Sequence, residues 1–99
     1  MSNVAETVSS LQALNAFLNA RRDITCRNVR KLDAMRYGKE KTALRAATAA
    51  FRARSAEMWN AMALCQNKPV DGKPNHYTCR DAAECEAMAA DLLARFRAE

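Results

Sequence analysis

The chain has 99 residues, of which 49% are hydrophobic, 27% charged and 6% aromatic, with only two glycines and two prolines. This composition excludes a disordered chain, a collagen-like repeat and a low-complexity linker. It also excludes an all-β sandwich or barrel, which would need turn residues at roughly every eight to twelve positions. The length fits one domain spanning residues 1–99, and frequent alanine, the strongest helix former, favours an all-α fold.

Positive charge is concentrated in the middle of the chain. The formal net charge is +5, from 16 Lys and Arg against 11 Asp and Glu. The segment Arg21–Arg54 holds eleven basic residues against three acidic ones, a net charge of +8, and the remaining residues carry −3. Such asymmetry favours an acidic protein surface or a nucleic acid as the partner.

The sequence shows no pattern typical of membrane proteins or of secretion. No positively charged start leads into an apolar signal core, and no stretch approaches the roughly 20 apolar residues that cross a bilayer. We therefore expect a cytoplasmic protein that does not contact membranes and whose thiols are reduced. Heavy use of Ala and Arg is typical of proteins from GC-rich bacterial and phage genomes.

The first half of the chain predicts one or two helices. Apolar residues three or four positions apart predict a helix at about residues 3–21. The pattern either continues as one long helix or breaks at Arg22-Asp23, where Asp23 would cap a second helix at about residues 23–37. We favour the break, because Arg22 would otherwise lie in the apolar seam. Gly38 predicts a kink or the C′ end of this region.

The second half predicts a long helix, a loop and a short helix. The most regular apolar stripe in the chain predicts a helix at about residues 39–66. Prolines, glycine, asparagines and aspartate at residues 67–77 end it with a loop. A last helix follows at about residues 78–97 and is capped by Thr78 or by Asp81, which has capping-box spacing to Glu84. The expected architecture is a three-helix bundle, or four-helix if Arg22-Asp23 is a break, or a long hairpin with a short C-terminal helix.

Thin apolar stripes and only six aromatic residues predict self-association, because a small core leaves little stability beyond the conformational entropy cost. We expect a homodimer or a larger oligomer. A tryptophan beside a methionine-rich stripe is typical of interaction surfaces, which makes four residues candidates for an oligomer or partner interface: Phe51, Met58, Trp59 and Met62. The alternative is that Trp59 covers the edge of the bundle.

Three cysteines and the single histidine flank the predicted loop, in the order Cys65, His76, Cys79 and Cys85. These four residues form a weak candidate zinc site, because their spacing matches no common zinc module. A Cys65–Cys79 disulfide is a second alternative, since it would join two helix ends across the loop. We favour the third interpretation, in which Cys65 and Cys85 are small core hydrophobes and the protein holds neither metal nor cofactor.

The sequence contains none of the motifs that would indicate catalysis. Metalloprotease, serine-hydrolase and P-loop motifs are absent, and two glycines are too few for a phosphate-binding loop. His76 has no carboxylate neighbour in the sequence that would activate it. We therefore expect no enzymatic activity and assign no catalytic residue. The alternative is a Cys–His nucleophile pair, whose members need to be adjacent only in space.

Basic residues supply the best functional candidates. Arg27, Arg30 and Lys31 share one helical face, and the next predicted helix carries Lys41, Arg45 and Arg52. We expect a non-catalytic protein-interaction module, such as an adaptor, inhibitor or assembly factor, whose basic face docks on an acidic partner. The alternative is a nucleic-acid-binding regulator that uses the basic segment Arg21–Arg54. No helix-turn-helix signature or interleaved aromatic residue supports that alternative.

Overall fold

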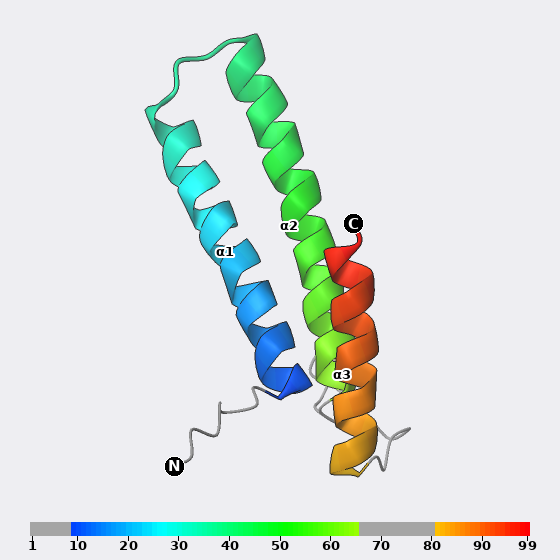
Figure 1. Cartoon of the computed structure of the whole chain (residues 1–99). Coiled ribbons are helices and arrows are strands. Elements are labelled where there is room, and N and C mark those ends of the chain that lie inside the picture. The colour runs from blue at the N-terminus through cyan, green and yellow to red at the C-terminus, as the bar shows by residue number, and fades with distance from the viewer. Residues whose placement is uncertain (1–8, 66–80) are drawn as a thin grey trace, which may run out of the picture.

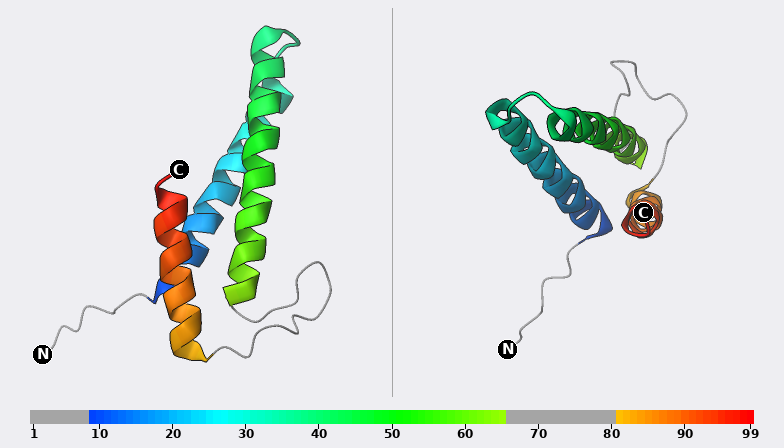
Figure 2. Two further views of the ribbon diagram at one scale, coloured as in Figure 1. Left: turned by 90° about the vertical axis from the view of Figure 1, so that its right-hand side faces the viewer. Right: turned by 90° about the horizontal axis from the view of Figure 1, so that it is seen from above.

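The computed structural model describes residues 9–65 and 81–99, which form three helices: α1 (Ser10–Ala34), α2 (Lys39–Cys65) and α3 (Ala82–Arg97) (Figure 1). Helices α1 and α2 form a long antiparallel hairpin. Helix α3 packs against both of them at the end of the hairpin away from the α1–α2 connection (Figures 1 and 2). The prediction of an all-α, three-helix bundle is confirmed.

Helix α1 is continuous through Arg22 and Asp23, so the break that the sequence favoured is wrong. Arg22 does not lie in an apolar seam, because its side chain is exposed and lines a surface hollow between α1 and α2. The arginine that faces α2 is Arg21, whose guanidinium stacks on the Phe51 ring, 3.9 Å from the centroid, and whose Nε donates a 2.8 Å hydrogen bond to Ser55 Oγ. The helix begins after an N-cap at Ser9, which forms a capping box with Gln12. The expected start at residue 3 lies outside the described residues.

The connection between α1 and α2 assigns Gly38 a different role from the one predicted. Helix α1 ends at Ala34, four residues before Gly38, and Met35 is its C-cap. The Gly38 carbonyl accepts hydrogen bonds from the Thr42 N–H at 3.1 Å and the Thr42 hydroxyl at 3.0 Å. Gly38 therefore caps the N-terminus of α2, a position at which glycine is favourable, and neither kinks nor ends a helix.

The other boundaries agree closely with the sequence patterns. Helix α2 starts at the predicted residue and is described as far as Cys65, and the predicted end at residue 66 lies outside the described residues. Helix α3 begins after an N-cap at Asp81, whose carboxylate accepts a 2.8 Å hydrogen bond from the Glu84 N–H. This confirms the predicted role of Asp81 as a cap, and the predicted start at residue 78 lies outside the described residues.

The core lies entirely at the end of the hairpin where all three helices meet. Its buried residues come from short stretches of each helix: Leu14 and Leu18 of α1, Met58, Met62 and Cys65 of α2, and Ala89, Leu92, Leu93 and Phe96 of α3. Phe17 extends the core by stacking on Phe96, with ring centroids 6.5 Å apart. We call the remainder of the hairpin, residues 22–56, the arm. Its only buried side chains among the described residues are Thr48 and Ser55.

Polar contacts fix α3 at both of its ends. Near its start, the Glu86 carboxylate accepts hydrogen bonds from the backbone N–H groups of Ser10 at 2.7 Å and Leu11 at 3.2 Å, and so caps the N-terminus of α1. Past its C-terminal end, Glu99 forms an ion pair with Arg54, whose guanidinium also lies over the Phe96 ring at 5.5 Å. Helix α3 is thus held on the hairpin by the hydrogen bonds to Glu86 near its start and by the Glu99–Arg54 ion pair past its end.

Candidate docking groove

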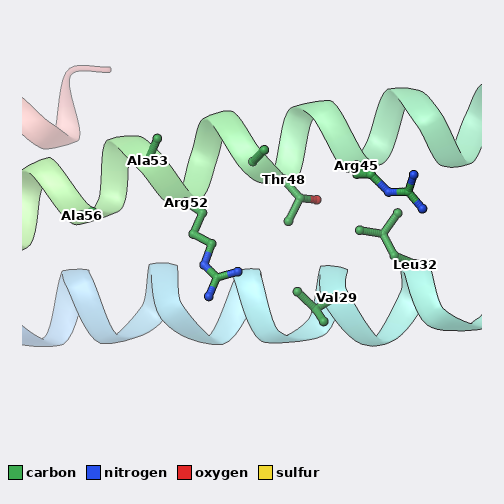
Figure 3. Close-up of a pocket in the computed structure, with 8 residues that line it drawn as sticks. Val29, Leu32, Arg45, Thr48, Arg52, Ala53 and Ala56 are labelled. Carbon is green, nitrogen blue, oxygen red and sulfur yellow. The ribbon is translucent and has the colours of Figure 1, made fainter.

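A groove runs along the arm between α1 and α2. Three adjoining hollows make it up, and they share Arg52 as a common lining residue. The largest of the three hollows has a volume of about 480 Å³ and lies between Val29 and Leu32 of α1 and the facing side of α2 (Figure 3). The groove continues past Thr25 and Cys26 to Trp59, which lies at the junction with the core.

The groove and α3 lie on opposite faces of the hairpin. Successive residues of an α-helix are rotated by about 100°, so Arg52 and Arg54 point to nearly opposite sides of α2. Arg54 contacts Glu99 and Phe96 on the α3 side, whereas Arg52 lines the groove and reaches from α2 toward α1 (Figure 3). On α1, Phe17 stacks on α3, and Cys26, nine positions later, lines the groove.

Small and apolar side chains line the floor of the groove. Three alanines of α2 form a ridge of small side chains, and Val29, which is 39% exposed, and Leu32 line the same hollow from α1 (Figure 3). The alanines are Ala49, Ala53 and Ala56. A surface of such small side chains lets the backbone of another helix approach closely.

Four arginines also line the groove: Arg22 and Arg30 from α1, and Arg45 and Arg52 from α2, with the Arg52 side chain extending across it toward α1 (Figure 3). No carboxylate lines the groove in the described part of the chain. Among the described residues, ion pairs join Arg54 to Glu57 and Glu99, and Arg95 to Asp91. None of the four groove arginines is therefore paired with a carboxylate in this part of the chain. The groove therefore combines small, apolar side chains with unpaired positive charges.

Thr48 lies under the groove with its hydroxyl unsatisfied. The residue is only 5% exposed, and among the described residues its Oγ1 is the buried side-chain oxygen or nitrogen without a hydrogen-bond partner. Burial of a hydroxyl without a partner costs free energy. The arm thus carries a polar defect at its centre, where a packed bundle would have an apolar contact.

Polar and charged side chains contact one another where the arm meets the core. Ser55 Oγ accepts the hydrogen bond from Arg21 and donates one to the Phe51 carbonyl at 2.8 Å. Burial lowers the pKa of the Arg21 guanidinium, an effect that the nearby Glu99 carboxylate opposes. Hydrogen bonds to Glu99 and then Glu57 raise the pKa of Arg54, and the Arg54 hydrogen bond lowers the pKa of Glu99.

The structure separates the predicted basic residues into three places. Arg45 and Arg52 line the groove, and Arg30 borders it. Arg27 lies on the outward side of α1 beside Asp23 and Ile24, and Lys31 is exposed on the same helix. Lys41 lies at the connection instead, where its Nζ donates to the Met35 carbonyl at 3.2 Å and lies 4.6 Å from the centroid of the Tyr37 ring.

The four predicted interface residues are also divided. Met58 is fully buried and Met62 is 5% exposed, so the intramolecular core already uses them. Phe51 is half-buried under Arg21, and the half-buried Trp59 lies at the groove's lower end. Only Phe51 and Trp59 retain appreciable surface for a contact with another chain.

Cys65 and Cys85 are both buried, and Cys65 belongs to the core cluster. The other two members of the candidate zinc site, His76 and Cys79, lie outside the described residues, and with them the predicted Cys65–Cys79 disulfide. Within residues 9–65 and 81–99, no three His, Cys, Asp or Glu side chains gather in a way that would hold a metal ion.

Several residues of the groove were missed by the sequence interpretation. Arg22 was interpreted only as evidence for a helix break, and the alanines of α2 were not considered as a surface. The spacing of Ala49, Ala53 and Ala56, four and then three residues apart, was the available signal, since it places them on one face of α2.

No described helix is long and apolar enough to cross a membrane. Comparison of the chain with protein-family models, with curated proteins and with solved structures finds no match. The functional assignment therefore depends on the groove itself.

Proposed function

We propose that this protein is a non-catalytic interaction module that docks on an acidic partner protein through the arm groove. The observation that supports the proposal is the set of four unpaired arginines around a carboxylate-free, largely apolar groove. Charge complementarity with an acidic surface would speed encounter and select the partner. The apolar floor would supply contact area once the surfaces meet.

The chemistry of the floor favours a protein over a nucleic acid. Nucleic-acid binding of this kind gains its affinity from neutralised phosphates, and a phosphate backbone gains nothing from Val29, Leu32 and an alanine ridge. The alternative function retains one supporting feature, the exposed basic residues Arg27 and Lys31 on the outward face of α1. The two functions therefore predict different sensitive residues.

The test titrates labelled poly-L-glutamate and a labelled random duplex of about 30 base pairs with the protein, over a salt series starting near 50 mM. Two double variants remove the same charge from different faces: Arg45→Gln with Arg52→Gln in the groove, and Arg27→Gln with Lys31→Gln outside it. Circular dichroism melts of each variant verify folding. Poly-L-glutamate binding is expected to weaken about tenfold at low salt in the groove variant and less than about twofold in the control.

Two results would contradict the proposal. Absence of poly-L-glutamate binding at the lowest salt would remove the acidic partner. Tighter binding of the duplex, weakened equally by both double variants, would replace it with the nucleic-acid function, because non-specific phosphate contacts depend on total charge more than on one groove.

A further inference from the structure

We propose that the occupant of the arm groove is a single amphipathic α-helix of the acidic partner, packed across α1 and α2. This inference rests on the proposed function and adds the shape of the partner and its charge pattern. It draws on three features of the described residues: the binding mode of α3, the spacing of the groove arginines and the position of the two faces.

Helix α3 shows how this hairpin holds a helix. It packs its apolar side into the α1–α2 pair, and carboxylates at its two ends meet positive groups of the hairpin. Glu86 meets the N-terminal amides of α1, and Glu99 meets Arg54. The opposite face offers small, apolar side chains and arginines further along the hairpin, but there the described structure contains no third helix (Figure 2).

The arginine spacing sets the charge pattern of the partner. Arg45 and Arg52 are seven residues apart on α2, which corresponds to about 10.5 Å along the helix axis. A partner helix lying along the groove repeats the same face every seven residues, so carboxylates at i and i+7 lie at the spacing of these two arginines. Because Arg22 and Arg30 lie on α1, the partner helix needs a second row of carboxylates on its other side. The predicted partner is a heptad helix with Ala or Leu at a and d and acidic residues at e and g.

The groove also sets the length of the partner. From Arg45 to Trp59 the groove follows fourteen positions of α2, about 21 Å, so one helix of four turns fills it. The alanine ridge allows close approach, as small residues do wherever helices pack tightly. Helix-in-groove binding of this kind places most of the apolar contact at the centre and the charges at the rim.

A second copy of this chain fits the groove less well than a separate acidic helix. Helix α3 is the acidic helix that a second copy would offer, but α3 and the groove lie on opposite faces of the hairpin. The contact would therefore be head-to-tail and would build a ring or a filament of several copies, not a closed pair. A separate partner helix closes the interface after one binding event.

The test uses two labelled synthetic peptides of identical composition, each of about 18 residues with acetyl and amide ends. In the first, glutamates occupy e and g beside Ala and Leu at a and d. In the second, the same glutamates occupy b and f, on the far side of the helix. The first peptide is expected to bind at least about tenfold more tightly, to gain helicity on binding and to form a 1:1 complex in sedimentation.

The matched protein variants complete the test. Arg45→Gln with Arg52→Gln is expected to remove most of the difference between the two peptides, and Arg27→Gln with Lys31→Gln to leave it intact. Equal binding of the two peptides, with poly-L-glutamate binding still sensitive to the groove arginines, would overturn the helix while leaving the proposed function in place. Loss of poly-L-glutamate binding overturns both. If the molar mass of the protein alone rises with concentration in sedimentation, and the groove variant abolishes this rise, a second copy is the occupant.

Discussion

The Glu86 cap on α1 makes the most direct stability prediction. Its carboxylate accepts hydrogen bonds from the N–H groups of Ser10 and Leu11, two of the amides that a helix N-terminus leaves without partners. Glu86→Gln keeps the size of the side chain but removes its charge and one accepting oxygen. Charge-assisted bonds are worth more than neutral ones, and the helix dipole adds to the loss, so we expect about 2 kcal/mol less stability.

That loss is large beside the roughly 5–15 kcal/mol that holds a domain of this size. Urea unfolding followed by circular dichroism measures it, and with an m-value near 1 kcal/mol/M the midpoint falls by about 2 M. Hydrogen exchange adds a local test, since the Ser10 and Leu11 amides should exchange faster in the variant. Glu84→Gln is the control, because Glu84 lies in the first turn of the same helix, so its substitution removes the same charge but not the Glu86 cap. Equal losses in the two variants would refute the cap.

Three further predictions concern single side chains. Ser55→Ala removes the acceptor for the Arg21 Nε, and unfolding in urea should show a loss of about 2 kcal/mol. Thr48→Val replaces an unsatisfied buried hydroxyl with a methyl group and should raise stability by about 1 kcal/mol in thermal unfolding. Arg54 lowers the folded-state pKa of Glu99, so this pair stabilises the fold above the ordinary Glu pKa of 4.5, and its contribution disappears as pH falls through the lowered pKa. The stability difference between wild type and Glu99→Gln should accordingly be constant near neutral pH and vanish in acid.

Each of these three has an outcome that contradicts it. A neutral Ser55→Ala would mean that Arg21 finds another acceptor. A loss of stability in Thr48→Val would mean that the Thr48 hydroxyl has a hydrogen-bond partner. The conclusion would be clearest if the loss equalled that of the exposed control Thr42→Val. Thr42 is a fair control because its hydroxyl bonds the Gly38 carbonyl. A Glu99→Gln difference that persists at low pH would show that the effect is not one of charge.

The helices were predictable because they depend on local patterns. The stripe ending at Met58, Met62 and Cys65 gave the register of α2, and these three residues are buried in the core. Asp81 was predictable as a cap because capping depends on residue type at one position. Continuity of α1 was not predictable in this way, because Arg21 is accommodated by Phe51 and Ser55, thirty and thirty-four residues further along the chain.

The groove depended on information that a periodicity analysis does not contain. The sequence placed Arg27, Arg30 and Lys31 together on a helix, but which of them faces α2 depends on the packing of the hairpin, and only Arg30 borders the groove. Glu86 gave no signal either, since its partners on α1 are 75 and 76 residues away in the chain. Long-range contacts of this kind decide which side of an amphipathic helix remains open.

The uneven distribution of apolar contacts along the hairpin connects its stability with its proposed function. The core and α3 stabilise one end, and the arm has no buried apolar residue among its described positions. The arm also contains ten of the eleven basic residues of the segment Arg21–Arg54 and three acidic ones, so its two helices repel each other electrostatically. We expect such a helix pair to open locally more readily than the described core. An acidic helix in the groove would supply both the missing apolar contact and the missing negative charge, and binding should therefore slow hydrogen exchange in the arm more than in the core.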